Sequence, residues 1–100
     1  MIRAQFNIPK GSFKINGHSG SAESGHDIVC AAVSSAAYMA VNTITEILGQ
    51  DVDANVSDGY MKITLRGSNQ TATDILRGLE LHVSELSKDY PDFIKIITEV

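Results

Sequence analysis

The order of two hydrophobic periodicities constrains the fold of this 100-residue chain more than any other feature. Apolar residues alternate over residues 2–15, with a Pro/Gly turn in the middle, which predicts a β-hairpin. A second alternating pair, residues 52–56 and 61–65, flanks the dipeptide Asp58-Gly59, a strong hairpin signal. Each hairpin pattern is followed by apolar residues at steps of three and four, which is typical of a helix.

The two helical patterns have clear limits. The first is predicted over residues 28–48, which lack glycine and proline, and Gly49 closes it. The second begins near Thr71 and stops before Pro91. Residues 93–97 have the length and apolar content of a final short strand.

The predicted order is therefore β-β-α-β-β-α-β in a single domain spanning residues 1–100. We expect an α+β fold with a mostly antiparallel sheet of about five strands and both helices packed on one face. The alternation leaves the other sheet face partly polar, with Tyr60 among its residues. A second copy of the chain is a plausible cover for that face.

Composition limits the functional classes. Eight basic and twelve acidic residues give a net charge of -4 without any run of Lys or Arg, which argues against direct nucleic-acid binding. The single cysteine excludes an internal disulfide. The first residues contain neither the apolar region of a signal peptide nor a spanning segment, so we expect a cytoplasmic protein without membrane contact.

The cysteine, Cys30, lies where the first helix is predicted to begin. Asp27 is a good N-cap residue, which would make Cys30 the third helical residue, close to free N–H groups that stabilise a thiolate. The alternative is core packing, because Cys30 shares one edge of the apolar stripe with Ala37 and Val41. The helix position alone does not decide between a nucleophile and a core residue.

Two histidines precede Cys30 and are candidate general bases. His18 ends the second predicted strand, and His26 comes immediately before the predicted cap, whereas His82 is interpreted as a solvated helix residue. His18, His26 and Cys30 also suit a zinc site by ligand type, although no H-E-x-x-H or C-x-x-C spacing supports one. The glycines match neither common phosphate-binding motif.

The segment from Gly17 to Gly25, around and after His18, is rich in small residues. Glycines alternate with serines in it, which predicts either a flexible lid over a bound peptide or an ordinary connection. These residues are Gly17, Ser19, Gly20, Ser21, Ser24 and Gly25.

Gly17-His18, followed after a short loop by the sequence from Gly25 to Ser34 (GHDIVCAAVS), resembles the signature of the Prp family of ribosomal-processing cysteine proteases. The motif covers about a fifth of the chain. It is specific, because the histidine, the D-I-V-C run and their separation occur together. Ser24 departs from the family pattern, since some members have an aromatic residue there.

The resemblance implies an activity and its partners. Members are small cytoplasmic endopeptidases that remove a short N-terminal extension from a large-subunit ribosomal protein, the one numbered twenty-seven, so that functional ribosomes assemble. They are homodimers and use a cysteine–histidine pair without a cofactor. Direct nucleic-acid contact and membrane contact are not expected.

The resemblance also implies roles for individual residues. Cys30 would be the nucleophile and His18 the base, while Asp27 would support the site or cap the helix. The substrate loop would comprise Gly17, Ser19, Gly20, Gly25 and His26. We expect backbone N–H groups between Gly25 and Cys30 to stabilise the oxyanion. A binding module that docks a ribosomal protein without cutting it, and a metal-dependent enzyme, are the alternatives.

Overall fold

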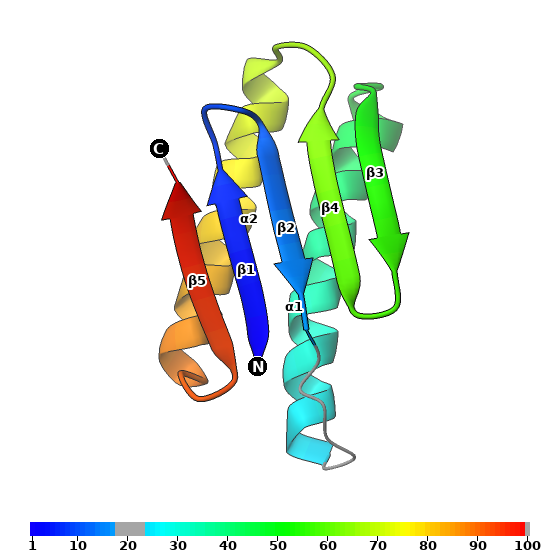
Figure 1. Ribbon diagram of the computed structural model, residues 1–100. Helices are drawn as coiled ribbons and strands as arrows, with labels where there is room; N and C mark the ends of the chain where they lie inside the picture. The colour runs from blue at the N-terminus through cyan, green and yellow to red at the C-terminus, as the bar shows by residue number, and fades with distance from the viewer. Residues whose placement is uncertain (18–23, 100) are drawn as a thin grey trace.

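The fold has two layers, a five-stranded sheet and two helices that both cover one of its faces (Figure 1). The computed structural model describes residues 1–17 and 24–99, the side chains of residues 24–27 and 99 excepted. The strand order is β3-β4-β2-β1-β5. The strands and helices are β1 (Ile2–Asn7), β2 (Ser12–Asn16), α1 (Ser24–Asn42), η1 (Thr43–Ile47), β3 (Val52–Ser57), β4 (Tyr60–Leu65), α2 (Gln70–Asp89) and β5 (Ile94–Glu99). The predicted fold class and element order are confirmed.

The sheet is mixed, because β5 pairs parallel to β1 while the other three strand pairs are antiparallel. Both predicted hairpins are present, β1–β2 and β3–β4, and Gly59 has a φ of +70° in the turn of the second. Phe6 and Phe13 are register partners whose stacked rings lie 5.8 Å apart at the centre of the core. Because side chains alternate along a strand, every second residue of β1 and β2 points toward the helices.

The first helix extends beyond the predicted range at its beginning. It starts at Ser24, whereas the sequence predicted a start after Asp27. At its other end the helix widens into the π-helical segment η1, where the Leu48 N–H donates to the Thr43 carbonyl at 3.0 Å. Gly49 then ends the segment with a φ of +67°, as the sequence predicted.

Residues 28–47 are apolar and long enough to qualify as a membrane span by length and composition alone. Core helices of globular domains share both properties. Here one face of the helix packs on the sheet through Val29, Val33, Ala37, Ala40 and Ile44, all of them buried. The length and apolar composition of this helix are therefore explained by its packing on the sheet.

The second helix, α2, has a side-chain cap. Asn69 is extended, and its Oδ1 accepts a hydrogen bond from the Ala72 N–H at 3.1 Å. Its apolar stripe is buried against the sheet through Ala72, Leu76, Leu79 and Val83. Thr98 of β5 donates to Glu80 of α2 at 3.2 Å, which links the last strand to this helix.

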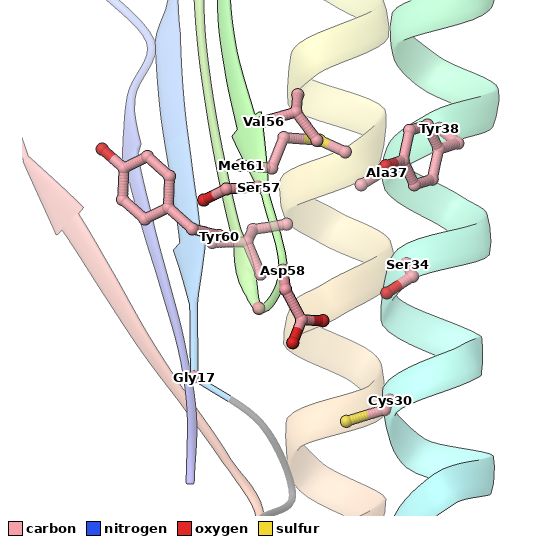
Figure 2. A pocket seen from close by; sticks show the side chains of 12 residues that line it. Gly17, Cys30, Ser34, Ala37, Tyr38, Val56, Ser57, Asp58, Tyr60 and Met61 are labelled. Carbon is pink, nitrogen blue, oxygen red and sulfur yellow. The ribbon is translucent and has the colours of Figure 1, made fainter.

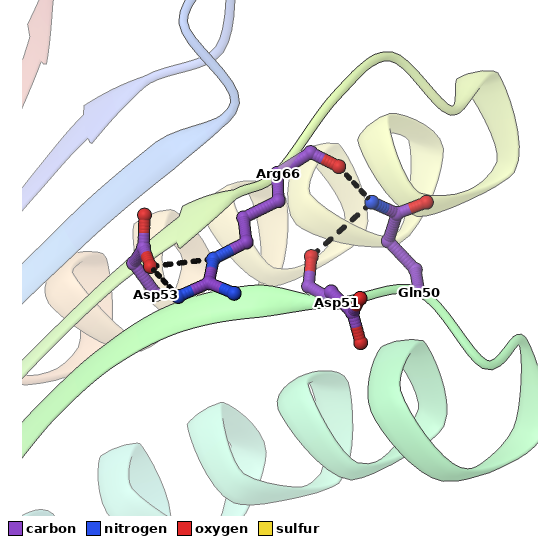
Figure 3. A network of polar contacts seen from close by, with 4 residues as sticks. All are labelled: Gln50, Asp51, Asp53 and Arg66. Carbon is purple, nitrogen blue, oxygen red and sulfur yellow. Dashed lines mark hydrogen bonds and ion pairs between the residues drawn. The ribbon is translucent and has the colours of Figure 1, made fainter.

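A polar network joins the loops at one end of the two layers (Figure 3). The Gln50 side-chain amide donates to the backbone carbonyls of Asp51 and Arg66, and its Oε1 accepts from Asn69 at 3.3 Å. Arg66 also pairs with Asp53 across β3 and β4 at 2.6 Å, and this hydrogen bond raises the pKa of Arg66 above its usual value. The end of η1 is thereby tied to β4 and to the cap of α2.

Candidate active site

Cys30 lines a cleft between α1 and the β3–β4 hairpin (Figure 2). The cleft has a volume of about 390 Å³. Cys30, Ser34 and Tyr38 lie along one side of α1, because residues four apart share a helix face. The facing wall comes from the hairpin and from the end of β2, and includes Asp58 and Gly17.

The Cys30 thiol is partly buried, and its sulfur is directed into the cleft (Figure 2). Its neighbours on α1 explain this intermediate position, since Val29 and Val33 are buried while Ser34 is exposed. Cys30 also packs against the edge of the core, near the stripe that the sequence indicated. The two interpretations of Cys30 are therefore compatible, because the residue borders the core and still reaches a cleft.

The position of Asp27 requires a correction. Because α1 begins at Ser24, Asp27 lies within the helix instead of capping it, and Cys30 lies in the second turn. The free N–H groups and the positive end of the helix are concentrated in the first turn. The expected stabilisation of a thiolate by the helix end is thus weaker than the sequence suggested, because the helix starts one turn earlier.

Gly17 brings the end of β2 to the cleft. Its N–H donates to the Gly59 carbonyl at 2.9 Å, which fastens the chain before His18 to the hairpin turn beside Asp58. Gly17 has a φ of +96°, and a Cβ there would lie 2.3 Å from the Met1 carbonyl oxygen. Only glycine fits this backbone position without displacement.

Several expected site residues lie outside the description. His18, Ser19 and Gly20 belong to the undescribed segment, and the side chain of His26 is not described either. The proposed pairing of a histidine with Cys30, the zinc alternative and the lid therefore remain predictions. Gly25 is placed as part of helix α1.

The cleft also contains residues that the sequence reasoning did not assign. Asp58 was interpreted only as a turn residue, yet its carboxylate points into the gap toward α1, on the side of Ser34 and Cys30 (Figure 2). The four-residue helical step from Cys30 was the available signal for Ser34. Nothing local in the sequence indicated that the tip of the second hairpin would face the cysteine, because that contact depends on how α1 crosses the sheet.

A family model, described as cysteine protease Prp, matches residues 1–95. The chain belongs to the Prp family of cysteine proteases. The match covers nearly all the described elements, from β1 to the start of β5. The resemblance inferred from the short motif around Cys30 is confirmed.

Relatives and solved structures agree with this assignment. The ribosomal processing cysteine protease Prp of Bacillus subtilis is 28% identical over 96 residues, covering 89% of this chain and 86% of the relative. The crystal structure of the essential ribosomal processing protease Prp from S. aureus with a covalently linked product peptide has a TM-score of 0.88. It is 25% identical and covers 99% of this chain and 100% of that one. SMU.848 from Streptococcus mutans is 32% identical with a TM-score of 0.84, covering 99% and 96%.

Membership in the Prp family makes the chain a cysteine peptidase. Family membership also favours the enzyme over the alternative of a non-catalytic binding module. Cys30 is the only cysteine of the chain, and it lines the cleft described above.

Proposed function

We propose that this Prp-family protein removes the N-terminal extension of the large-subunit ribosomal protein numbered twenty-seven, with Cys30 as nucleophile and His18 as base. The observation that carries the proposal is the position of the only cysteine in a cleft open to a peptide. The covalently linked product peptide in the S. aureus relative supports a covalent mechanism by similarity. Location in the cytoplasm is part of the same proposal.

The chemistry follows from a thiolate and a neighbouring imidazole. His18 takes the proton of Cys30, and the sulfur attacks the scissile carbonyl carbon to form a tetrahedral oxyanion. The C–N bond then breaks, the imidazolium protonates the leaving amine, and the trimmed protein departs. Water hydrolyses the remaining thioester, which releases the extension and restores the thiol.

The oxyanion requires hydrogen-bond donors. In an α-helix that starts at Ser24, the N–H groups without a helical partner belong to the first turn. In the range from Gly25 to Cys30, where we expected the oxyanion donors, only the N–H groups of residues 25–27 lack a helical partner. We therefore narrow the proposed donors to the backbone of residues 25–27, where loss of one donor costs about 100-fold or more in rate.

The cleft walls suggest how a peptide is held. An extended segment that enters between α1 and the hairpin would run past Ser34 and Tyr38 on one side and Val56 on the other. Tyr38 and Val56 are both exposed, which gives the upper part of the cleft an apolar surface. This surface suits an apolar or aromatic side chain near the cleavage position.

The experiment is incubation of the purified protein with the full-length ribosomal precursor, followed by mass measurement of the products. We expect one cut in the extension by the wild type and none by Cys30→Ala. His18→Ala should abolish cleavage, whereas His26→Ala should only slow it. The reverse order for the two histidine variants would move the base to His26. A chelator should leave the cleavage rate unchanged. Loss of cleavage in the presence of the chelator would favour the zinc alternative.

A further inference from the structure

The sheet face opposite the helices gathers four cations from four different strands. These cations are Arg3 of β1, Lys14 of β2, Lys62 of β4 and Lys95 of β5. Each lies next in sequence to a buried core residue, so alternation directs it away from the helices. Three are exposed and Lys14 is half-buried. We name these four residues the cationic face.

The strand register makes the cations direct neighbours. Lys14 lies opposite Lys62 across β2 and β4, and Arg3 lies opposite Lys95 across β1 and β5. Like charges placed directly opposite one another destabilise a sheet. We therefore expect another interaction to offset the repulsion within these two pairs.

Among the described side chains, no ion pair offsets this repulsion. In the part of the chain that the structure describes, ion pairs join Arg66 to Asp53, Arg77 to Asp74 and Lys88 to Glu85, and none involves the cationic face. The cationic face thus concentrates half of the eight basic residues of an acidic chain on one surface without an anionic partner among the described side chains.

Polar and aromatic side chains lie in the same rows. Tyr60, Asn16, Arg3 and Lys95 form one row across four adjacent strands, and the next row contains Lys62, Lys14 and Gln5. At the usual strand spacing, the first row extends about 14 Å across the sheet and the second about 10 Å. The Tyr60 ring points away from the helices (Figure 2), and the register places Tyr60 in the same row as Arg3 and Lys95.

We propose that the cationic face binds single-stranded RNA. Lysine and arginine would contact phosphates, Tyr60 offers a surface on which a base can stack, and the amides of Asn16 and Gln5 suit sugar hydroxyls. RNA is the polyanion expected around a protease of a ribosomal-processing family. The sequence predicted no nucleic-acid contact, because the cations are dispersed along the chain and only the sheet register brings them together.

A second copy of the chain fits this face less well. In a twofold dimer through the sheets, the cationic face of one protomer would meet the same four charges of its partner. An acidic protein segment would match the charge but would leave Tyr60 without a stacking partner. Both occupants are distinguishable from RNA by experiment.

The test is fluorescence anisotropy with a labelled single-stranded RNA of about 16 nucleotides. For four phosphate contacts, the slope of log affinity against log salt should be about −2.8. Replacing Lys14 and Lys62 together by Gln should weaken binding at least about tenfold in low salt and bring the slope near −1.4. Replacing Arg77 and Lys88 by Gln removes the same charge from α2 and should change affinity less than about threefold.

Defined outcomes overturn the proposal. Absence of RNA binding in low salt, equal losses in the two double variants, or tighter binding of polyglutamate than of RNA would each do so. A change of oligomeric state in the Lys14/Lys62 variant would assign the face to a second copy instead. Circular dichroism verifies that each variant folds. Cleavage of an isolated peptide should be unchanged in both variants, so this test is separate from that of the protease activity.

Discussion

At the scale of single residues, the nature of Cys30 was only partly predictable. The sequence placed Cys30 at one edge of the apolar stripe of α1, and the structure agrees, because helical spacing is a local property. Ser34 was not assigned although the helical step from Cys30 indicated it, whereas the place of Asp58 beside Cys30 depends on the crossing of α1 over the second hairpin. The charge pairs of the sheet were missed for the same reason, because register is a long-range property.

Gly17→Ala should destabilise the protein and lower its activity. The new Cβ would meet the Met1 carbonyl oxygen in a backbone conformation that L side chains rarely adopt, and the segment leading to His18 would shift. Gly49→Ala is the matched control, because its φ of +67° imposes similar strain but no atom lies within 4 Å. Thermal unfolding and peptide cleavage should both show a larger loss for Gly17→Ala. Equal losses would mean that the contact with Met1 is unimportant.

Ser34→Phe should block the cleft, since Ser34 is exposed and lies one helical turn after Cys30. We expect kcat/KM to fall by about tenfold or more, equivalent to about 1.4 kcal/mol, because a phenyl ring would occupy space needed by the peptide. Asn42→Phe adds the same ring to an exposed position of α1 outside both this cleft and the groove between α1 and α2, and should retain activity. Similar kinetics for the two variants would contradict the assignment of the cleft as the substrate site.

At the scale of elements, the sequence predicted the five strands and the two α-helices of the described chain, but it misplaced the start of α1 and did not predict the π-helical segment η1. The glycines and serines before Asp27 suggested a loop, yet the helix already begins at Ser24. Intrinsic propensity is a weak guide at helix ends, where neighbouring structure often decides. The error matters here because it changed the expected surroundings of Cys30.

Asn69→Ala should destabilise the domain by about 1 kcal/mol, because it removes the N-cap of α2. It also removes the bond to Gln50 that joins the cap to the end of η1. Ser68→Ala changes the exposed neighbour and should stay within about 0.5 kcal/mol of the wild type. Urea denaturation measures both, and an unchanged midpoint for Asn69→Ala would show that the cap contributes nothing.

At the scale of the whole molecule, the two layers expose different surfaces. The sheet carries the cationic face, whereas the helices form an apolar groove between α1 and α2 of about 680 Å³ that includes Ala36, Met39 and Leu79. We propose that the homodimer implied by the family resemblance forms through the helices. Repulsion between two cationic faces disfavours the sheet, which the sequence had suggested as the covered surface.

Met39→Glu should therefore shift the protein toward monomers in sedimentation velocity. Met39 is 68% exposed on the groove, and a buried carboxylate without a partner would destabilise the interface. Leu81→Glu is a suitable control, because Leu81 is 63% exposed but lies outside the groove. If Leu81→Glu dissociated the dimer and Met39→Glu did not, the interface would lie elsewhere on α2.

The central claim is that Cys30 attacks the precursor from within the cleft. It is tested most directly by quenching the reaction with acid at early times and measuring the intact mass of the enzyme. The account predicts a transient mass increase equal to the N-terminal extension minus water, located on the peptide that contains Cys30 and absent from Cys30→Ala. Normal trimming by Cys30→Ala, without any adduct on the wild type, would contradict it.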